Sequence, residues 1–439
     1  MSTKKTLILL SLFMIVLSAC QAAEEPMAVV QPVVENIAAA ASISTEMTEP
    51  TKPAPVVAAP KLAQSQPTAV NSQDIGPDPE DIPAGYNPLT GLPVTDPAML
   101  KLPAVLVSIT NFPPSSRPQA GLSFSPWVFE VYIAEGMTRF LATFYGDYPK
   151  LGDGTNLAST ISQANNQTGN SSNSTTNPSK SPIQGFAAQI GPVRSGRLAY
   201  VPIRDFFQNS CLVYAGATQE IRAKLRGCAM VYGSDATDIN SAMLDTSRLQ
   251  KIAEQNQRDN LSFNYSGSLF TVNPPSQGIP AKQIDVYYSL LNQSQWLFDP
   301  LTAAYLKFED FADGSGKFTS AKDRLNGKQL AFSNIVILYA EHIVLNPYII
   351  DVKMGMGERG KAIIFRDGQK YQAFWSTVSG EYEKATGLRR PIHFEDANGN
   401  PFAFKPGQTW VHIVTPFTEV QDKKDGIWRL RFYAPAGTK

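Results

Sequence analysis

Arginines and small polar residues recur in three short segments of the sequence, in a pattern that suits an anionic ligand. The candidate ligand-binding residues are Arg117 in the first segment, Glu135, Thr138 and Arg139 in the second, and Arg194, Ser195 and Arg197 in the third. Gly191-Pro192 predicts a turn, and Ser195 with Gly196 predicts the cap of a following helix. Free N–H groups at a helix start, with two arginines beside them, would bind a carboxylate or a phosphate.

Ion pairing would give the same arginines a structural role instead. Arg194 and Arg197 would then pair with Glu130, Glu135 or Asp205 and hold two strands and a helix in register. Structural ion pairs are the commoner role of such residues. The sequence leaves ligand binding and ion pairing as alternatives for this segment.

An inventory of nucleophiles and bases favours a binding protein over an enzyme. The three histidines, His342, His393 and His412, all lie within or beside predicted strands, where a packed or surface residue is commoner than a catalytic base. The motif Gly-x-Ser-x-Gly does not occur. Three Cys and three His almost exclude a Cys/His zinc site. We therefore expect no metal and no cofactor.

Two carboxylates provide the alternative candidate for catalysis. Glu130 and Glu135 would act as acid and base on peptidoglycan or another glycan, with Arg139, Arg194 and Arg197 beside them. The two glutamates are five residues apart on or near one predicted strand, so their side chains should point to opposite faces. That placement weakens the glycosidase hypothesis.

Cys211 and Cys228 begin two predicted strands that flank a short helical segment. Neighbouring strands lie about 5 Å apart, which is near the distance that a disulfide spans. A disulfide here would add about 3 kcal/mol of stability. Two buried free thiols fit the sequence equally well.

The candidate residues lie in a segment, residues 84–275, that mixes strand and helix signals. Runs of branched and aromatic residues predict three strands, at 104–110, 127–134 and 139–145. Residues 197–208 predict a helix, and residues 211–232 predict a strand, a helix and a strand in a compact βαβ unit. We expect an α/β layered domain with a low-complexity insertion, rich in Asn, Ser and Thr, at residues 151–182.

Residues 284–439 show many strand signals and little helix. The strands are expected at 284–288, 305–308, 334–339, 361–365, 371–375, 392–394, 409–414 and 428–433. Asp367-Gly368 and Asn398-Gly399 lie between strand signals and predict tight hairpin turns. The predicted fold class is α+β, an N-terminal α/β layered domain followed by a mostly antiparallel β domain.

The first twenty residues carry the features of an exported lipoprotein. Lys4 and Lys5 precede an apolar run, residues 6–17, that is too short for a stable membrane span and is followed by Ser18-Ala19-Cys20. This order resembles a bacterial lipobox, in which Cys20 is acylated, for example with palmitate, and becomes the first mature residue. An ordinary secretory signal with an incidental Cys is the alternative. Residues 21–83 are rich in Ala and Pro, have no aromatic residue and predict a disordered tether.

The order of several motifs resembles the YerB-like family of bacterial lipoproteins. The motifs are Asn87–Pro93, Arg117–Ser123, Glu135–Phe140, Ile190–Arg197, Asn334–Tyr339, Gly360–Phe365, Phe394–Gly399 and Pro406–Trp410. The resemblance covers almost all of the chain from about residue 84. It implies a two-domain, surface-anchored lipoprotein of a family whose biochemical activity is not established. The chain departs from the family in the insertion at 151–182 and in residues 256–265, which lack the His usual there.

Charge and composition narrow the choice of partner. The 439-residue chain has 38 basic and 38 acidic residues and a formal net charge of zero, which argues against a nucleic-acid-binding protein. We expect a lipid-anchored binding or scaffolding protein on the extracytoplasmic face of the cell membrane. The membrane would hold it through Cys20, and a cell-wall polymer or an envelope protein would be the partner of an Arg-rich site in the N-terminal domain. The alternative is an envelope enzyme that acts on peptidoglycan or another glycan through a carboxylate.

Overall fold

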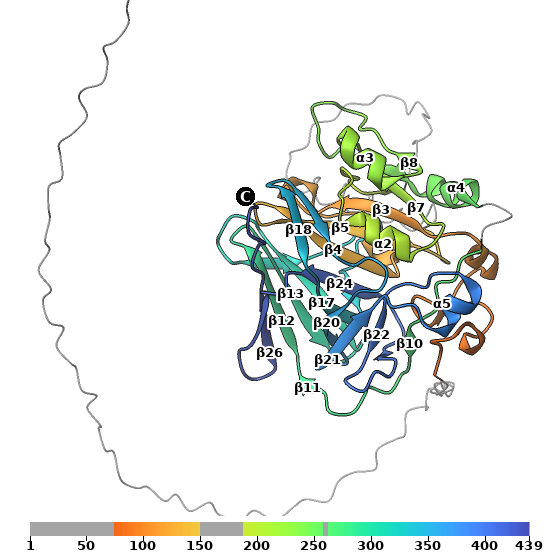
Figure 1. Ribbon diagram of the computed structural model, residues 1–439. Coiled ribbons are helices and arrows are strands. Elements are labelled where there is room, and N and C mark those ends of the chain that lie inside the picture. Colours follow the sequence, from red (N-terminus) through yellow and green to blue (C-terminus); the bar gives the residue numbers. More distant parts are fainter. Residues whose placement is uncertain (1–73, 150–187, 258–261, 439) are drawn as a thin grey trace, which may run out of the picture. The chain divides into compact units, whose positions relative to one another are not determined.

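The computed structural model describes residues 74–149, 188–257 and 262–438 (Figure 1). The predicted signal peptide with Cys20, most of the predicted tether and the predicted insertion lie outside these residues. Residues 74–83, which the prediction assigned to the tether, lie along the folded chain. Ile75 and Phe270 exchange two main-chain hydrogen bonds of 2.9 and 2.8 Å there. All described residues belong to one compact unit.

An eleven-stranded sheet takes strands from both predicted domains. Its N-terminal strands are β3 (Val105–Thr110), β4 (Trp127–Ala134), β5 (Met137–Phe144), β7 (Cys211–Tyr214) and β8 (Ala229–Met230). Its later strands are β11 (Ile279–Pro280), β17 (Asn334–Tyr339), β20 (Arg359–Arg366), β21 (Gln369–Ser376), β22 (His393–Glu395) and β24 (Thr409–Val414). The two groups join at β4 and β24, which are parallel neighbours with Glu130 opposite His412. The domain boundary stays a prediction.

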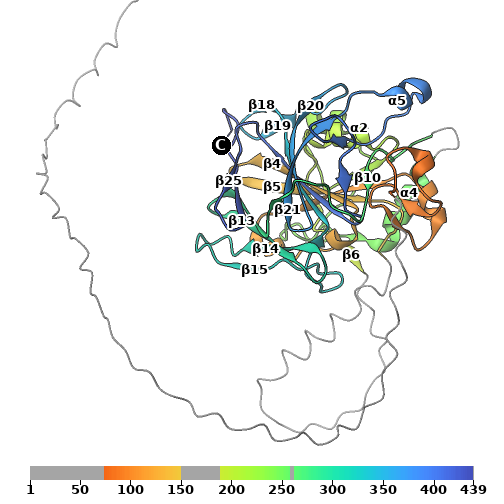
Figure 2. The same ribbon diagram turned by 90° about the horizontal axis from the view of Figure 1, so that it is seen from below.

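A second sheet of seven strands packs against the first. Its strands are β12 (Gln283–Ser289), β13 (Asn292–Asp299), β14 (Ala304–Asp310), β15 (Phe318–Ser320), β16 (Ala331–Phe332), β25 (Glu419–Asp422) and β26 (Ile427–Arg431). Buried residues alternate with half-buried ones along β12, because only one face of the strand packs inward. Ile284 and Val286 of that face share a core with Ile335 and Trp410 of the larger sheet. Figure 2 shows β13, β14 and β15 on one side of β4 and β5.

Four α-helices accompany these strands in the described residues: α2 (Tyr200–Phe206), α3 (Gln219–Leu225), α4 (Thr246–Asn256) and α5 (Glu381–Thr386). Ile203 of α2 and Leu225 of α3 share a core cluster with Leu106, whereas Leu249 of α4 belongs to the cluster of Val107. Strands therefore predominate and the sheets are mixed and antiparallel, which confirms a β-rich fold. The predicted α/β layering stays a prediction. No helix in the described ranges has the length and apolarity that a membrane span requires.

Most of the predicted elements are present. The strands predicted at 127–134, 334–339 and 409–414 match β4, β17 and β24 residue for residue, and β7, α3 and β8 form the predicted βαβ unit with parallel strands. Asp367 and Gly368 join β20 to β21 in a hairpin and both have a positive φ. The helix predicted at 197–208 is shorter, because α2 begins at Tyr200 with Ala199 as its N-cap. The prediction that Ser195 and Gly196 cap this helix is wrong.

Candidate functional site

Arg139, Arg194 and Arg197 form an arginine cluster on one face of the larger sheet. β5 supplies Arg139, and alternation along the strand places it on the face of Leu141, which packs in the cluster of α2. Arg194 is fixed beside β3, because its N–H donates to the Ser108 carbonyl oxygen at 2.9 Å. The segment that precedes α2 thus brings Arg194 and Arg197 to a strand that lies more than fifty residues earlier in the chain.

Several polar atoms of this arginine cluster are buried and have no hydrogen-bond partner among the residues that the structure describes. Arg139 is 6% exposed, and its Nε and Nη1 atoms have no partner among the described residues. The buried Nε atoms of Arg194 and Arg197 likewise lack one within that part of the chain. Burial, together with the nearby charges of Arg197 and Arg194, lowers the pKa of Arg139 to about 9. A buried charge without a counter-ion costs several kcal/mol of stability, so the cluster favours binding of an acceptor.

None of the ion pairs found in the described ranges includes an arginine of this cluster. The three carboxylates expected as partners are placed elsewhere: Glu130 pairs with His412, Asp205 pairs with Arg204, and Glu135 lies in the turn between β4 and β5 with a φ of 53°. Burial lowers the pKa of Arg194, and Asp238 opposes that shift without reaching ion-pair distance. Nη2 of Arg194 donates to the amide oxygen of Asn240 at 3.0 Å.

Hydroxyl groups lie beside the arginine cluster. The hydroxyls of Tyr200 and Ser108 are 3.0 Å apart, and Ser108 Oγ also donates to the Ser195 carbonyl oxygen at 3.3 Å. Burial raises the pKa of Tyr200, while the charges of Arg139 and Arg197 oppose the increase. Ser195 therefore contributes its main chain to the local structure, and the cluster combines cationic N–H groups with neutral hydroxyls.

This arrangement suits an anion and excludes a metal cation from the same place. Guanidinium groups donate hydrogen bonds and carry positive charge, so they bind carboxylate or phosphate oxygens and repel a metal ion. Among the described residues, no group of three or more His, Cys, Asp or Glu side chains is arranged to hold a metal ion. The cluster supplies positive charge and hydrogen-bond donors, which can bind an anion.

The other predicted site residues lie away from the arginine cluster. Arg117 pairs with Glu309 at 3.4 Å and with Asp310 at 3.3 Å, and its Nη1 donates to the Asp310 carbonyl oxygen at 2.6 Å. Thr138 lies on the face of β5 opposite to Arg139, and its hydroxyl donates to Glu130 at 2.7 Å. Glu135 is exposed in the turn. The predicted site residues are therefore divided between two faces of the sheet. Of the predicted arginines, Arg117 is the one that forms ion pairs within the described residues.

The segment from Arg117 to Ser123 is held by a buried carboxylate of the second half of the chain. Asp323 is fully buried and accepts the main-chain N–H groups of Gly121 at 2.8 Å and Ser123 at 2.8 Å. The hydroxyl of Ser123 donates to the same carboxylate at 2.8 Å, and the N–H of Leu325 adds a bond of 2.9 Å. The Gly121 and Ser123 N–H groups and the Ser123 hydroxyl therefore hold this segment in place through internal bonds.

Sequence reasoning treated Glu130 and His412 separately, although they form one buried network. Glu130 is 2% exposed and His412 is fully buried. The indole N–H of Trp410 donates to Glu130 at 3.1 Å, and that of Trp296 donates to His412 Nε2 at 3.2 Å. Glu130 and His412 are each a polar residue within an apolar strand segment. A buried polar residue needs a polar partner, so this pattern could have predicted that the two lie together.

A buried lysine lies beside the same network. Lys307 is 3% exposed, and its Nζ lies 5.3 Å from the Trp410 ring centroid and 5.7 Å from the Phe140 ring centroid. Burial lowers the pKa of Lys307, and the charges of Glu309 and Glu130 oppose that shift. Burial alone would raise the pKa of Glu130, but His412, Lys307 and the Thr138 hydroxyl lower it below its usual value. The carboxylate is therefore held ionised in the interior.

Cys211 and Cys228 are joined by a disulfide, with Cα atoms 5.4 Å apart and seventeen residues of sequence separation. Cys211 begins β7, and Cys228 immediately precedes β8, its parallel neighbour. The bond therefore closes the βαβ unit around α3. Gly196, in the segment that carries Arg194 and Arg197, packs against this unit, because an added Cβ would meet Leu225 at 2.1 Å.

Comparison with known proteins places the chain beside a bacterial lipoprotein. Residues 89–152 match the family described as "Protein of unknown function (DUF3048) N-terminal domain", and residues 284–411 match its C-terminal domain. The chain is 26% identical over 348 residues to "Putative lipoprotein YerB" of Bacillus subtilis (strain 168), covering 74% of this chain and 85% of YerB. The crystal structure of the B. subtilis YerB protein has the same fold, with a TM-score of 0.50, 22% identity, and coverage of 75% of this chain and 96% of that one. The chain therefore carries the N- and C-terminal domains of the DUF3048 family and is homologous to YerB.

Proposed function

We propose that this protein is an extracytoplasmic lipoprotein that binds an anionic component of the cell envelope at the arginine cluster. The observation that carries the proposal is Arg139, a buried guanidinium whose Nε and Nη1 atoms have no acceptor in the described part of the chain. The order of basic residues, apolar run and Cys20 supports lipid anchoring, as does homology to a protein named a lipoprotein.

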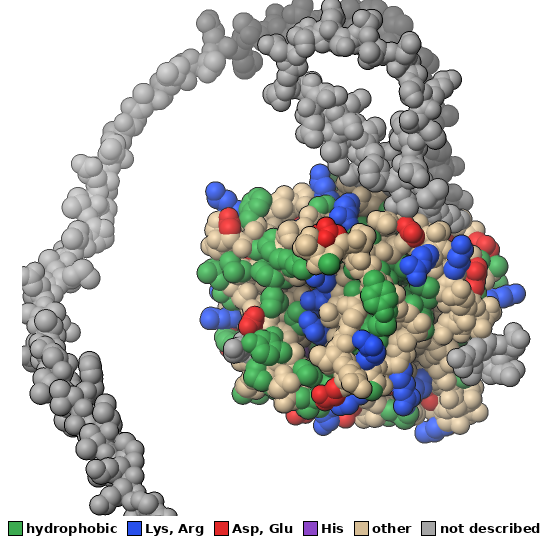
Figure 3. Space-filling model, turned by 90° about the horizontal axis from the view of Figure 1, so that it is seen from above, with side chains coloured by type: hydrophobic (Ala, Val, Ile, Leu, Met, Phe, Trp, Pro, Cys, Tyr) green, Lys and Arg blue, Asp and Glu red, His purple; other side chains and the backbone are tan. Residues whose placement is uncertain are grey.

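Three guanidinium groups that have no carboxylate partner among the described residues favour a ligand with more than one negative charge. Each arginine presents several N–H donors in a planar fork that matches the oxygens of a phosphate or a carboxylate. Figure 3 shows further Lys and Arg side chains along the middle of one face of the molecule, with hydrophobic side chains on both sides. A polymer with repeated phosphates or carboxylates would present several negative charges to the guanidinium groups, whereas a single small anion would present fewer.

The carboxylates disfavour the glycosidase alternative. A general acid in glycan hydrolysis needs a carboxyl whose pKa is raised. The pKa of Glu130 is instead lowered, and the side chain is 2% exposed within a network of internal bonds. Glu135 lies in an exposed turn at the end of β4. The two residues therefore do not face each other across a common substrate position.

Anion titration of the full-length protein tests this proposal. The probes are inorganic phosphate, poly(glycerol phosphate) and a peptidoglycan fragment that carries free carboxylates, and binding is followed by calorimetry at low and high salt. The test variant is Arg194→Gln/Arg197→Gln, and the control is Lys423→Gln/Lys424→Gln, which removes the same charge from an exposed turn. We expect at least one probe to bind, its affinity to fall with salt, and binding to drop about tenfold or more in the test variant alone.

Melting temperature separates a ligand site from a structural role. If the cluster is a ligand site, the melting temperature of the Arg194→Gln/Arg197→Gln variant should not fall, because the substitution removes charges that repel Arg139. A variant that melts several degrees lower, together with no binding of any probe to the wild type, would show that the arginines are structural and would overturn the proposal.

A further inference from the structure

Five strands of the larger sheet run in the same direction and end at one edge. β17, β24 and β4 are parallel neighbours. β3 and β7 run the same way, because β5 is antiparallel to both β4 and β3, and β7 is parallel to β3. At the usual strand spacing this edge spans about 24 Å from β17 to β7. The loops that follow the five strands therefore lie along one end of the molecule.

The loops after β17 and β24 carry exposed apolar side chains. β17 is followed by a hairpin of β18 (His342–Asn346) and β19 (Ile349–Val352), which pair with each other and with no further strand of the described residues. Ile343 and Leu345 lie on one face of β18, and Leu345 is 51% exposed. Phe417, in the loop after β24, is 71% exposed. Exposed apolar side chains that gather in this way are typical of a binding surface.

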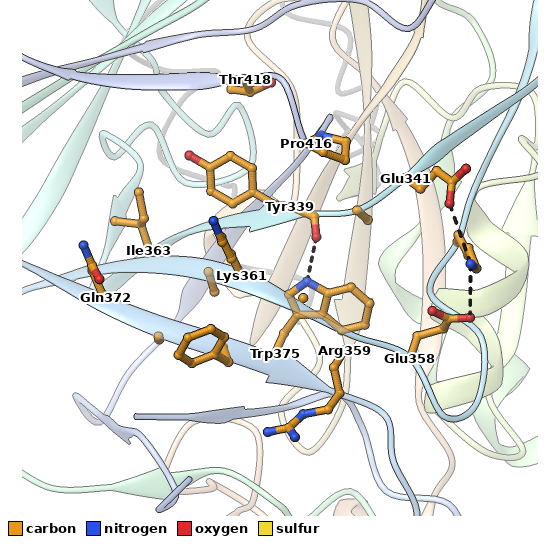
Figure 4. Close-up of a pocket in the computed structure, with 16 residues that line it drawn as sticks. Tyr339, Glu341, Glu358, Arg359, Lys361, Ile363, Gln372, Trp375, Pro416 and Thr418 are labelled. Atoms are coloured by element: carbon orange, nitrogen blue, oxygen red, sulfur yellow. Dashed lines mark hydrogen bonds and ion pairs between the residues drawn. The ribbon is translucent and has the colours of Figure 1, made fainter. Parts of the chain in front are cut away.

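A pocket connects the base of this hairpin with the loop of Phe417. The pocket has a volume of about 700 Å³, and its lining includes Glu341, which precedes β18, and Pro416 and Thr418, which flank Phe417 (Figure 4). Lys353, directly after β19, pairs with Glu341 at 3.7 Å in the same lining. The two apolar loops are therefore neighbours.

The second sheet adds apolar side chains at the same end. The turn between β12 and β13 lies against the turn between β4 and β5, since the side-chain amide of Asn292 donates to the Gly136 carbonyl oxygen at 3.0 Å. Leu290 and Leu291 in the first of these turns are exposed, as is Phe311 directly after β14. β14 ends at this edge because it is antiparallel to β13. Both sheets thus contribute to the apolar part of the surface.

Exposed cations lie at the other part of the edge, after β7. α3 exposes Arg222 and Lys224, and Arg226 is exposed at its C-cap, whereas Glu220 is the single carboxylate of the helix. None of these three cations forms an ion pair among the described residues. Burial raises the pKa of Asp351 in β19, and the charge of Lys224 opposes the increase, so α3 lies near the hairpin.

Cations and apolar side chains on one surface complement an anionic lipid bilayer. Figure 1 shows α3 and the tip of β18 at the same end of the molecule, and Figure 3 views the molecule from that end. Headgroup phosphates attract Lys and Arg, and the interfacial layer of the bilayer accepts apolar and aromatic side chains. A soluble polyanion would leave the apolar side chains uncovered, whereas a flat bilayer contacts both parts of the edge at once.

The length of the chain before the folded part permits this contact. Residues 21–73 separate Cys20, the predicted site of lipid attachment, from the described residues, and they reach at most about 180 Å when fully extended. A compact body of this size has a diameter of about 50 Å. A body held at Cys20 can therefore turn this edge toward the membrane, and the attachment raises the local concentration of the two surfaces.

We propose that this edge docks on the surface of an anionic lipid membrane. The side chains of Ile343, Leu345 and Phe417 enter the headgroup layer, and the cations of α3 contact lipid phosphates. The inference rests on the membrane location in the proposed function, and it does not depend on anion binding at the arginine cluster. Docking gives the anchored protein a defined orientation on the membrane.

Site-specific fluorescence on lipid vesicles tests the inference. The full-length protein carries Cys20→Ser, so that no acyl chain contributes, and either Leu345→Cys or Leu301→Cys, labelled with an environment-sensitive dye. Leu301 is the matched control, because it is 94% exposed and follows β13 at the opposite edge. The vesicles contain phosphatidylglycerol and phosphatidylcholine in equal amounts, or phosphatidylcholine alone. We expect the emission at position 345 to shift to shorter wavelength on the anionic vesicles, and the emission at position 301 to stay unchanged.

Two double variants, each with the dye at position 345, test the apolar and the cationic part. Ile343→Ser/Phe417→Ser and Arg222→Gln/Lys224→Gln should each weaken vesicle binding at least tenfold. Lys423→Gln/Lys424→Gln is the charge control and should bind like the parent protein, because the turn between β25 and β26 lies at the opposite edge.

Three results would overturn the inference. One is the absence of a shift at position 345 up to millimolar lipid, and another is an equal shift at positions 345 and 301, since other residues would then bind the vesicle. The third is self-association that Ile343→Ser/Phe417→Ser abolishes, without a shift on vesicles, because a second copy would then cover the apolar side chains. The soluble anions test the arginine cluster and the dye tests contact with lipid, so failure of either proposal is distinguished from failure of the other.

Discussion

Glu130 and His412 face each other across neighbouring parallel strands, with the carboxylate Oε2 and the imidazole Nδ1 3.1 Å apart in the interior. An indole N–H can only donate, so the bond from Trp296 requires His412 Nε2 to be unprotonated. Nδ1 then carries the hydrogen atom and donates a hydrogen bond to the Glu130 carboxylate. The pair connects β4 with β24 at the point where the early and late strands of the larger sheet meet.

Loss of one member of this pair should destabilise the protein strongly. His412→Leu leaves the Glu130 charge without its partner, and we expect the unfolding free energy to fall by about 3 kcal/mol, as measured by urea denaturation. The double variant Glu130→Leu/His412→Leu should be less destabilised than the sum of the single variants. His393→Leu is the control, because His393 is partly exposed and should cost less than about 1 kcal/mol. Strict additivity of the single effects would contradict the coupling.

Stability should fall at mildly acidic pH through His342. This side chain is 8% exposed, and burial lowers its pKa from 6.5 to about 4, despite a hydrogen bond to the Ala340 carbonyl oxygen. Between these two pH values the unfolded chain binds one proton more than the folded chain, so stability drops as the pH falls from about 6.5 to about 4. The contribution is at most about 1.4 kcal/mol per pH unit.

Substitution of His342 measures this contribution directly. We expect His342→Leu to lose less stability than the wild type between pH 7 and pH 4.5 in urea titrations. The pH profile of His393→Leu is measured beside it, because burial lowers the pKa of His393 as well and this residue could also contribute to the acid sensitivity. Identical pH profiles of wild type and His342→Leu would show that another group accounts for the acid sensitivity.

Two buried arginines should respond to the same substitution with opposite signs. Arg366 is fully buried and bonds Asp367 at 2.7 Å and the carbonyl oxygens of Ala403, Thr271 and Val272, so Arg366→Met should destabilise the protein by about 3 kcal/mol or more. Arg139 lacks acceptors for two of its nitrogens in the described residues. Arg139→Met should therefore raise the melting temperature in the absence of ligand while it weakens anion binding. A marked loss of stability in Arg139→Met would mean that its charge is already compensated.

The disulfide should be detectable by mass and by stability. Alkylation of the denatured protein without reductant should leave Cys211 and Cys228 unmodified, and prior reduction should add two alkyl groups. The double variant Cys211→Ala/Cys228→Ala should lose about 3 kcal/mol of unfolding free energy, the value for a loop of this length. Alkylation of both residues without reduction would show free thiols in the native protein.

Strands that are buried on both faces were predictable from the sequence. β4, β17 and β24 are buried along nearly their whole length, so they appear in the sequence as continuous apolar runs that a pattern detects directly. β13 was not predicted, because Asn292, Gln293, Ser294 and Gln295 precede its Trp296 and hide the alternation of a half-exposed strand. Local pattern thus identifies the interior strands better than the outer ones.

Pairing between distant strands was not predictable in the same way. The sequence of β4 does not indicate that β24 is its neighbour, because strand pairing and register depend on packing across the whole sheet. The candidate site shows the same limit. Arg194 and Arg197 were singled out from their spacing, but the divided placement of Thr138 and Arg139 depends on which face of β5 packs against the second sheet.

The parallel pairing of β4 with β24 has a consequence for how the newly made chain folds. Trp410 and Glu130, which are bonded across this pair, are 280 residues apart in the sequence. One side of β4 therefore stays uncovered until nearly the whole polypeptide has been synthesised. Exposed apolar strand edges invite aggregation and proteolysis. A chain truncated before residue 409 therefore lacks the strand that pairs with β4 and leaves that strand edge open to proteases and chaperones.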